Sequence, residues 1–145
     1  MMESPQLMMG QHLTNDRGGI SFVNDFTFNG VKRFYMLHNR QAGMPREWHG
    51  HRTEFKYVMM IKGAAKVAGV AIDDWQNPSK DAKVYCYELS AAQPMVLYIP
   101  PGYANCFKAL TDDVTVMFFS NLTVEQSHAD DFRWPADYWD PWSKV

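Results

Sequence analysis

The chain has 145 residues, a net charge of −2 at pH 7 and a charged fraction of 21%, which are ordinary values for a folded domain. This balance lacks the excess of basic residues that nucleic acid or an anionic membrane attracts, so we expect neither as a partner. The length fits one domain, residues 1–145, and suffices to bury a core without disulfide bonds.

Aromatic residues make up 14% of the chain, which favours strands and a pocket that stacks on flat rings. The cysteines, Cys86 and Cys106, lack a metal-type spacing and are typical of buried thiols in a reducing compartment. Residues 1–10 have no basic start followed by an apolar run, and no apolar stretch is long enough to cross a bilayer. We therefore expect a cytoplasmic protein.

Short segments rich in Val, Ile, Tyr, Phe and Met follow one another along the chain, separated by turn residues such as Asn29-Gly30 and Pro100-Pro-Gly102. We predict six strands from them, at residues 31–38, 56–62, 66–72, 84–89, 96–99 and 114–120. No longer window keeps a helical period. Many short strands with Gly and Pro turns indicate an all-β sandwich or barrel.

Two polar segments complete the pattern. Residues 73–81 are predicted to form a hairpin loop, and residues 125–145 form an acidic, aromatic C-terminal tail. We expect a short helix over 125–131 and extended chain over 134–141. Tails of this composition usually pack over a barrel mouth or a partner subunit.

One segment contains two glycines, two histidines and a lysine: Gly43, His49, His51, Lys56 and Gly63. A second segment runs Pro100-Pro-Gly102-Tyr-Ala-Asn105. Their spacing resembles the two sequence motifs of the cupins, which implies a jelly-roll barrel, also called a double-stranded β-helix.

The positions that hold a metal-binding Glu and His in the cupin motifs are Lys56 and Asn105 in this chain. A charged ammonium has no lone pair and repels a cation, so two of the expected ligands are missing. Glu54 lies two positions earlier in the predicted strand, where it shares the face of Lys56 without sharing its position. We therefore predict a site without metal or any other cofactor, and a metal-dependent cupin dioxygenase is disfavoured.

The chain also resembles two branches of the cupin sugar-nucleotide isomerases. Arg46, His49 and Lys56, with Tyr98 to Phe107, resemble the dTDP-4-dehydrorhamnose 3,5-epimerase family. The chain resembles the dTDP-sugar 3,4-ketoisomerases in three stretches: Lys32-Arg33-Phe34-Tyr35, Arg46 with His49 and His51, and Asp131-Phe132-Arg133. The epimerases use a Tyr acid in the strand after the Pro-Gly motif, and Phe118 stands there in this chain.

The resemblance implies an isomerase that removes a proton next to the ketone of a nucleotide-diphosphate 4-keto-6-deoxy sugar, in cell-surface polysaccharide biosynthesis. Histidine suits the base because its pKa lies near neutral pH. We expect His49 as the base and His51 as relay or acid, with Tyr35 a second candidate acid. Lys56 or Arg46 holds the oxyanion, because a cation stabilises charge that develops as the proton leaves.

The substrate also needs a clamp for its diphosphate. Arg33 and Arg46 are candidate donors, because guanidinium binds phosphate oxygens bidentately. Tyr103 is a candidate to stack on a base or sugar, and Asn105 to hydrogen-bond a sugar oxygen.

Less specific interpretations stay open. His49 and His51 alone are weak evidence, and Lys56 on an alternating strand is compatible with a surface lysine. Because Phe118 and Asn105 replace the Tyr and His, the alternative function is a non-catalytic sugar or small-ligand binding cupin. Under either function the family resemblance implies a homodimer.

Overall fold

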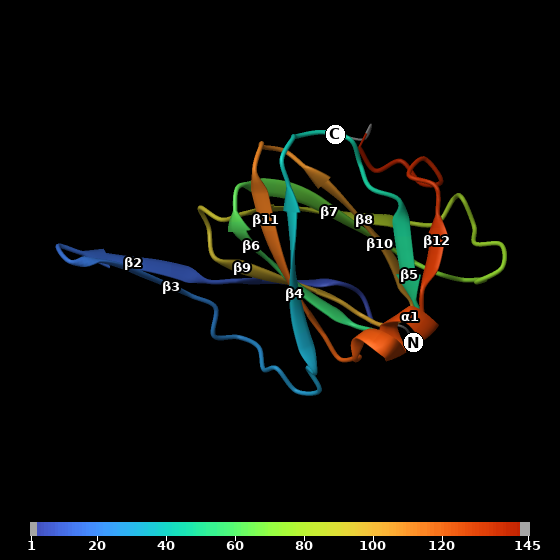
Figure 1. Cartoon of the computed structure of the whole chain (residues 1–145), viewed down its shortest axis with the longest axis horizontal. Coiled ribbons are helices and arrows are strands. Elements are labelled where there is room, and N and C mark those ends of the chain that lie inside the picture. Colours follow the sequence, from blue (N-terminus) through green and yellow to red (C-terminus); the bar gives the residue numbers. More distant parts are fainter. Residues whose placement is uncertain (1–2, 143–145) are drawn as a thin grey trace.

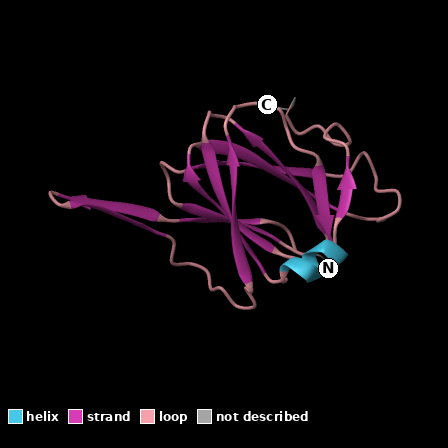
Figure 2. Ribbon diagram, in the orientation of Figure 1, coloured by secondary structure: helices cyan, strands magenta, loops and turns pink. Residues whose placement is uncertain are grey.

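The computed structural model describes residues 3–142, and its strands form two five-stranded antiparallel sheets that face each other (Figures 1 and 2). In spatial order the first sheet holds β1 (Gln6–Met9), β9 (Met95–Ile99), β6 (Lys56–Lys62), β11 (Val114–Ser120) and β4 (Arg33–Asn39). The second holds β12 (Phe132–Trp134), β5 (Trp48–His51), β10 (Tyr103–Ala109), β7 (Ala64–Ala71) and β8 (Val84–Ser90). The predicted all-β class is confirmed.

Two further elements lie outside the sheets. The hairpin of β2 (Gln11–Asn15) and β3 (Gly18–Phe22) projects from the body as an arm, and the helix α1 (Val124–Ala129) lies beside the end of β5 (Figure 1). The helix begins with a capping box, because Thr123 accepts from the backbone of Gln126 and the Gln126 side chain accepts from the backbone of Thr123. Among residues 3–142, no helix is long and apolar enough to span a membrane.

The predicted strands at 56–62 and 114–120 coincide with β6 and β11, and the other four lie within two residues of observed strands. The sequence did not predict β5 and β10, because neither shows an apolar run: β5 reads Trp-His-Gly-His. These strands form through pairing, with Asn105 opposite His49 and Ala104 opposite Gly50. Cross-strand hydrogen bonds therefore replace local propensity at the strand that carries both histidines.

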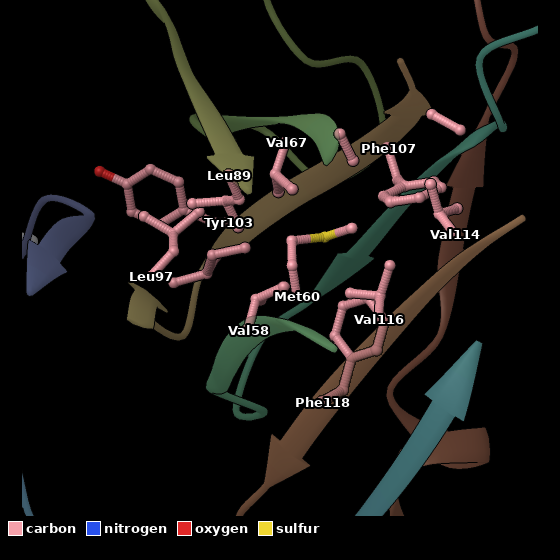
Figure 3. Packing of buried hydrophobic residues seen from close by; sticks show 13 residues of the cluster. Val58, Met60, Val67, Leu89, Leu97, Tyr103, Phe107, Val114, Val116 and Phe118 are labelled. Atoms are coloured by element: carbon pink, nitrogen blue, oxygen red, sulfur yellow. The ribbon is translucent and has the colours of Figure 1, made fainter. Parts of the chain in front are cut away.

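The hydrophobic core lies between the two sheets, where the strands bury alternate side chains. Figure 3 shows its members, which come from both sheets. They include Val58, Met60, Val67, Leu89, Leu97, Tyr103, Phe107, Val116 and Phe118. Phe107 and Phe118 also line a hollow that contains His49 and Lys56, so the apolar core borders directly on these polar side chains.

The C-terminal tail covers the outer face of the second sheet. Trp139 is 2% exposed and packs edge-on against Trp48, with ring centroids 5.1 Å apart. The Trp48 indole N–H lies 3.2 Å from the carbonyl oxygens of both Ala136 and Trp139. The expected helix is α1, but the expected extended chain over 134–141 is wrong after Trp134, because the chain turns back to bury Trp139. Residues 143–145 of the predicted tail lie outside the described residues.

Truncation of the buried tail residue tests this packing. We expect Trp139→Ala to lower the free energy of unfolding by about 3–5 kcal/mol, because it removes a fully packed ring together with its hydrogen bond to Ser79. The measurement is urea denaturation followed by circular dichroism. Met44→Ala is the control, since Met44 is 87% exposed and should change stability by less than about 0.5 kcal/mol. Equal midpoints for the two variants would contradict the role of the tail.

Candidate active site

The polar end of the barrel interior contains two adjoining hollows of about 150 and 270 Å³. Both are lined by Tyr35, His49 and Lys56, which come from both sheets, so the two hollows are neighbours around these side chains. Asn105 lines only the smaller hollow and Arg133 only the larger; we name them the Asn105 hollow and the Arg133 hollow. A still larger hollow of about 430 Å³ lies on the β2–β3 arm, but no histidine or carboxylate lines it.

Lys56, at the start of β6, is a buried cation at the centre of this space. It is 7% exposed, and its ammonium lies 5.5 Å from the ring centroid of Phe118 and 5.9 Å from that of Tyr35. These two rings are paired across β11 and β4 and stack with centroids 4.9 Å apart. No ion pair to Lys56 is formed by a carboxylate of residues 3–142. A buried charge without a counter-ion is costly, which is typical of a group kept for a ligand.

His49 projects from β5 into both hollows. Its Nδ1 lies 3.6 Å from Oδ1 of Asp131, so the other ring nitrogen is available to a ligand. Burial lowers the pKa of His49, and the cations Lys56 and Arg133 lower it further, against the carboxylates of Asp131 and Glu47. The imidazole is therefore neutral near pH 7 and can accept a proton.

Asp131 is a site residue that the sequence indicates only as part of the late stretch Asp131-Phe132-Arg133. Arg133 Nε donates to Asp131 Oδ2 at 3.0 Å, and Arg133 Nη1 donates to Glu47 at 3.1 Å. Although burial works to raise the pKa of Asp131, the hydrogen bond and charge of Arg133 lower it overall. The carboxylate beside His49 thus stays ionised. Spacing from His49 could not identify it, since 82 positions separate the two.

His51 lies deeper, with its side chain 6% exposed, and lines the Arg133 hollow. Its Nδ1 lies 2.7 Å from the backbone carbonyl oxygen of Asp130, which can only accept, so Nδ1 carries a proton. Nε2 is buried and has no hydrogen-bond partner among residues 3–142. Burial and the charge of Lys56 lower the pKa of His51, while Glu54 and Asp130 oppose them. Nε2 is thus a bare acceptor.

Glu54 is fully buried and joins the two sheets at this end. One carboxylate oxygen accepts from Arg33 at 3.2 Å and from the Ser120 hydroxyl, and the other accepts from Ser127 at 3.0 Å. The expectation that Glu54 shares a strand face with Lys56 is wrong, because it lies in the loop before β6. Its carboxylate therefore points to β4, β11 and α1.

The predicted substrate-binding residues are not all brought together. Arg46 and Asn105 line the Asn105 hollow, and Asn105 lies opposite His49 in the β10–β5 pair. Arg33 lines the Arg133 hollow, but it already donates to the Leu122 carbonyl and to Glu54. Tyr103 lines neither hollow: it is 3% exposed in the core, and its hydroxyl, at the edge of the cluster in Figure 3, donates to the Glu3 carbonyl. Tyr103 therefore packs in the hydrophobic core and does not line the site.

The metal prediction concerned Lys56 and Asn105. Within residues 3–142, no group of three His, Cys, Asp or Glu side chains is placed to hold a metal ion. Cys106, which lines the Asn105 hollow, donates its thiol to the Arg46 carbonyl, and burial raises its pKa to about 12. It is therefore not a thiolate ligand at neutral pH. That the site works without metal stays a prediction.

Two facing antiparallel sheets with a histidine pair in the interior define a cupin barrel. The family model for dTDP-4-dehydrorhamnose 3,5-epimerase matches residues 26–139, which is most of the chain. The chain belongs to this family of dTDP-sugar epimerases and isomerases. No curated protein matches the sequence.

Solved structures are similar over almost the whole chain at low identity. A dTDP-4-dehydrorhamnose 3,5-epimerase from Bacillus anthracis, with TDP and pyrophosphate bound, is 18% identical over 97% of this chain and 86% of its own, with a TM-score of 0.73. A 3'-monoepimerase from Streptomyces bikiniensis in complex with dTDP-quinovose is 16% identical over 99% and 77%, with a TM-score of 0.78. A 3,4-ketoisomerase double mutant from Thermoanaerobacterium thermosaccharolyticum in complex with TDP is 18% identical over 97% and 94%, with a TM-score of 0.67. These likenesses confirm the jelly-roll cupin fold.

The loop between β5 and β6, which carries Glu54, is anchored by Asp130. Its carboxylate accepts the backbone N–H groups of Arg52, Thr53 and Glu54 at 2.8–3.0 Å, and the Thr53 hydroxyl at 3.0 Å. Burial alone would raise the pKa of Asp130, but these hydrogen bonds lower it overall.

This geometry predicts a stability contribution that depends on pH. A carboxyl with a lowered folded-state pKa stabilises the fold above its unfolded pKa of about 3.9, and the stabilisation is lost as the pH falls through the folded-state pKa. We expect Asp130→Asn to cost about 1–3 kcal/mol at pH 7 and progressively less in acid, measured by urea denaturation across the pH range. A cost that does not vary with pH would contradict the charged state.

Proposed function

We propose that this protein is a metal-independent epimerase or ketoisomerase that acts on a nucleotide-diphosphate 4-keto-6-deoxy sugar by proton abstraction next to the ketone. The observation that carries the proposal is Lys56, a buried ammonium without a carboxylate partner among residues 3–142, which lines the same hollows as His49. An enolate oxygen placed there would gain the counter-charge that the ammonium lacks.

His49 is the proposed base. Removal of a proton from carbon leaves an electron pair that moves onto the ketone oxygen, where Lys56 stabilises it. Asp131 faces the opposite side of the His49 ring and stabilises the imidazolium that forms. The lowered pKa of His49 keeps the base unprotonated at neutral pH.

Tyr35 is the proposed acid. Phe118 has no proton to donate, but Tyr35 stacks on it from the neighbouring strand and brings a phenol into both hollows. If the proton returns to the opposite face of the same carbon, the product is an epimer. If it returns to the neighbouring carbon, the keto group moves, and a hydroxyl proton must also be lost. The bare Nε2 of His51 can accept that proton.

The diphosphate is assigned to the Asn105 hollow. Arg46 lines it, and the Asn105 amide is beside the proposed base. TDP bound to two structures of similar fold supports a nucleotide ligand. Arg33 is not proposed as a phosphate donor, because Glu54 and Leu122 hold its guanidinium, and Tyr103 is not proposed as a stacking group. Cell-surface polysaccharide biosynthesis remains a prediction of the family resemblance, and the cytoplasmic location remains a prediction from the cysteines and from residues 1–10.

Isotope exchange tests the reaction directly. The metal-stripped protein is incubated with dTDP-4-keto-6-deoxyglucose in deuterated water, and the sugar protons are followed by NMR. We expect loss of the C3 signal, either with loss at C5 for an epimerase or with movement of the keto group to C3 for a ketoisomerase. His49→Asn should slow exchange by about 10²–10⁴-fold. In the unchanged protein, the acid limb of the pH–rate profile should lie below the ordinary histidine pKa of about 6.5.

His38→Asn is the matched control, because His38 is exposed on β4. Unchanged exchange in His49→Asn would overturn the assignment of the base. Binding of a dTDP-, GDP- or UDP-linked keto sugar without exchange of any sugar proton for deuterium would establish the alternative, a non-catalytic sugar-binding cupin.

We also propose that two copies pair through the outer face of the first sheet. That face exposes Phe34 and Met36 on β4, at 61% and 47%, whereas the tail covers the second sheet. The accessible surface is 8621 Å², about 1,000 Å² more than a compact monomer of 16.8 kDa has. A standard interface buries about 800 Å² per partner, so the extra accessible surface is about as large as the area that contact with a second copy would bury.

The arm supports the same arrangement. Its Leu13 and Ile20 are 56% and 62% exposed, and an isolated two-stranded hairpin is marginally stable in water. We expect the parent protein to sediment as a dimer and Phe34→Arg as a monomer, measured by analytical ultracentrifugation. Asp81→Arg, on the exposed loop beside the second sheet, should stay dimeric. A monomeric parent protein would contradict the proposal.

A further inference from the structure

Glu54 is a buried carboxylate for which neither the sequence motifs nor the proposed reaction has a role. One of its oxygens, Oε2, is taken by Arg33 and Ser120. The other, Oε1, accepts from Ser127 and lies 3.3 Å from Nδ1 of His51. A group that only neutralised Arg33 would not need its second oxygen directed at an imidazole in a ligand hollow.

The contacts of His51 define what Glu54 can do there. Nδ1 is protonated because it donates to the Asp130 carbonyl, and Glu54 Oε1 lies 3.3 Å from the same nitrogen. Nε2 is consequently a lone pair, buried and without a partner among residues 3–142, on a histidine that lines the Arg133 hollow. A histidine fixed at one nitrogen and bare at the other is prepared to accept a proton.

We propose that Glu54 is a positioning residue for His51: its carboxylate holds the ring with Nε2 bare toward the hollow and stabilises the imidazolium that forms when Nε2 takes a proton. The inference rests on the proposed function. The step balances, since Nε2 forms an N–H bond while a substrate O–H bond breaks and leaves its electron pair on oxygen. Glu54 takes no proton itself.

The charges that face His51 come from several elements. Lys56 on β6 opposes protonation of the ring, as does burial. Glu54 in the loop before β6, Asp130 after α1 and Asp131 before β12 favour it. Of these carboxylates, only Glu54 lies within ion-pair distance of the His51 ring. Because Arg33 contacts the opposite oxygen, the anion is nearer to the imidazole than its cation is.

The test follows the His51 imidazole by ¹⁵N NMR through a pH titration of the substrate-free protein, with the signal assigned by its loss in His51→Asn. We expect Glu54→Gln to lower the pKa of His51, because it removes an anion, while the Asp130 carbonyl keeps the proton on Nδ1. Glu54→Asp keeps the charge and should restore part of the pKa. Ser127→Ala is the matched control, because it removes a neutral hydrogen bond to the same oxygen and should leave the titration unchanged.

Kinetics give a second readout. In Glu54→Gln we expect kcat to fall by about 10–100-fold with little change in KM, and the acid limb to move to lower pH. If Glu54→Gln does not fold, since it leaves Arg33 without its carboxylate, the double variant Glu54→Gln with Arg33→Gln removes both charges. It should still lower the pKa of His51, because the carboxylate that is lost lay nearer to the ring than the guanidinium that is lost.

The two proposals fail separately. An unchanged His51 pKa in Glu54→Gln would overturn the inference, whatever the activity. A lowered pKa in a protein that exchanges no sugar proton would support the role of Glu54 and contradict the proposed function.

Discussion

Two buried carboxylates hold the open end of the barrel together. Asp130 gathers three backbone N–H groups of the loop between β5 and β6, and Glu54, in that loop, reaches β4, β11 and α1. Leaving a buried donor or carboxylate unpaired costs more than most single contacts contribute, so this network tolerates few alternative arrangements. The sheets are thereby fixed relative to each other where the functional side chains project. A rigid polar frame of this kind is what positions proton-transfer groups to within a fraction of an ångström.

The charges inside this frame are arranged unequally. Arg33 and Arg133 are held by carboxylates, while Lys56 is buried against two aromatic rings and has no ion-pair partner among residues 3–142. Burial lowers the pKa values of both histidines, and the same ammonium lowers them further, which keeps the imidazoles neutral. One buried cation therefore prepares the oxyanion site and the bases together, which is how pKa tuning separates acid and base roles in a single space.

The motif residues show how far spacing carries a prediction. His49 and His51 lie on one face of β5, and Lys56 begins β6, so a few residues of sequence bring all three into one hollow. Asp131 was missed as a partner because it reaches His49 through the β12–β5 pairing, which spacing does not encode. Tyr103 shows the opposite failure: its aromatic character suggested stacking on substrate, but its position placed it in the core.

The sequence by itself determined the strand-rich class, the histidine pair, the lysine in place of a metal ligand and the family. These depend on composition and on spacing within one or two strands, where geometry follows directly from the backbone period. Only the tertiary structure decided which charges are free. Arg33 became a partner of Glu54, His51 was fixed by Asp130, and Lys56 was left without an ion-pair partner among residues 3–142. Contacts between residues distant in the chain exist only once both sheets are packed.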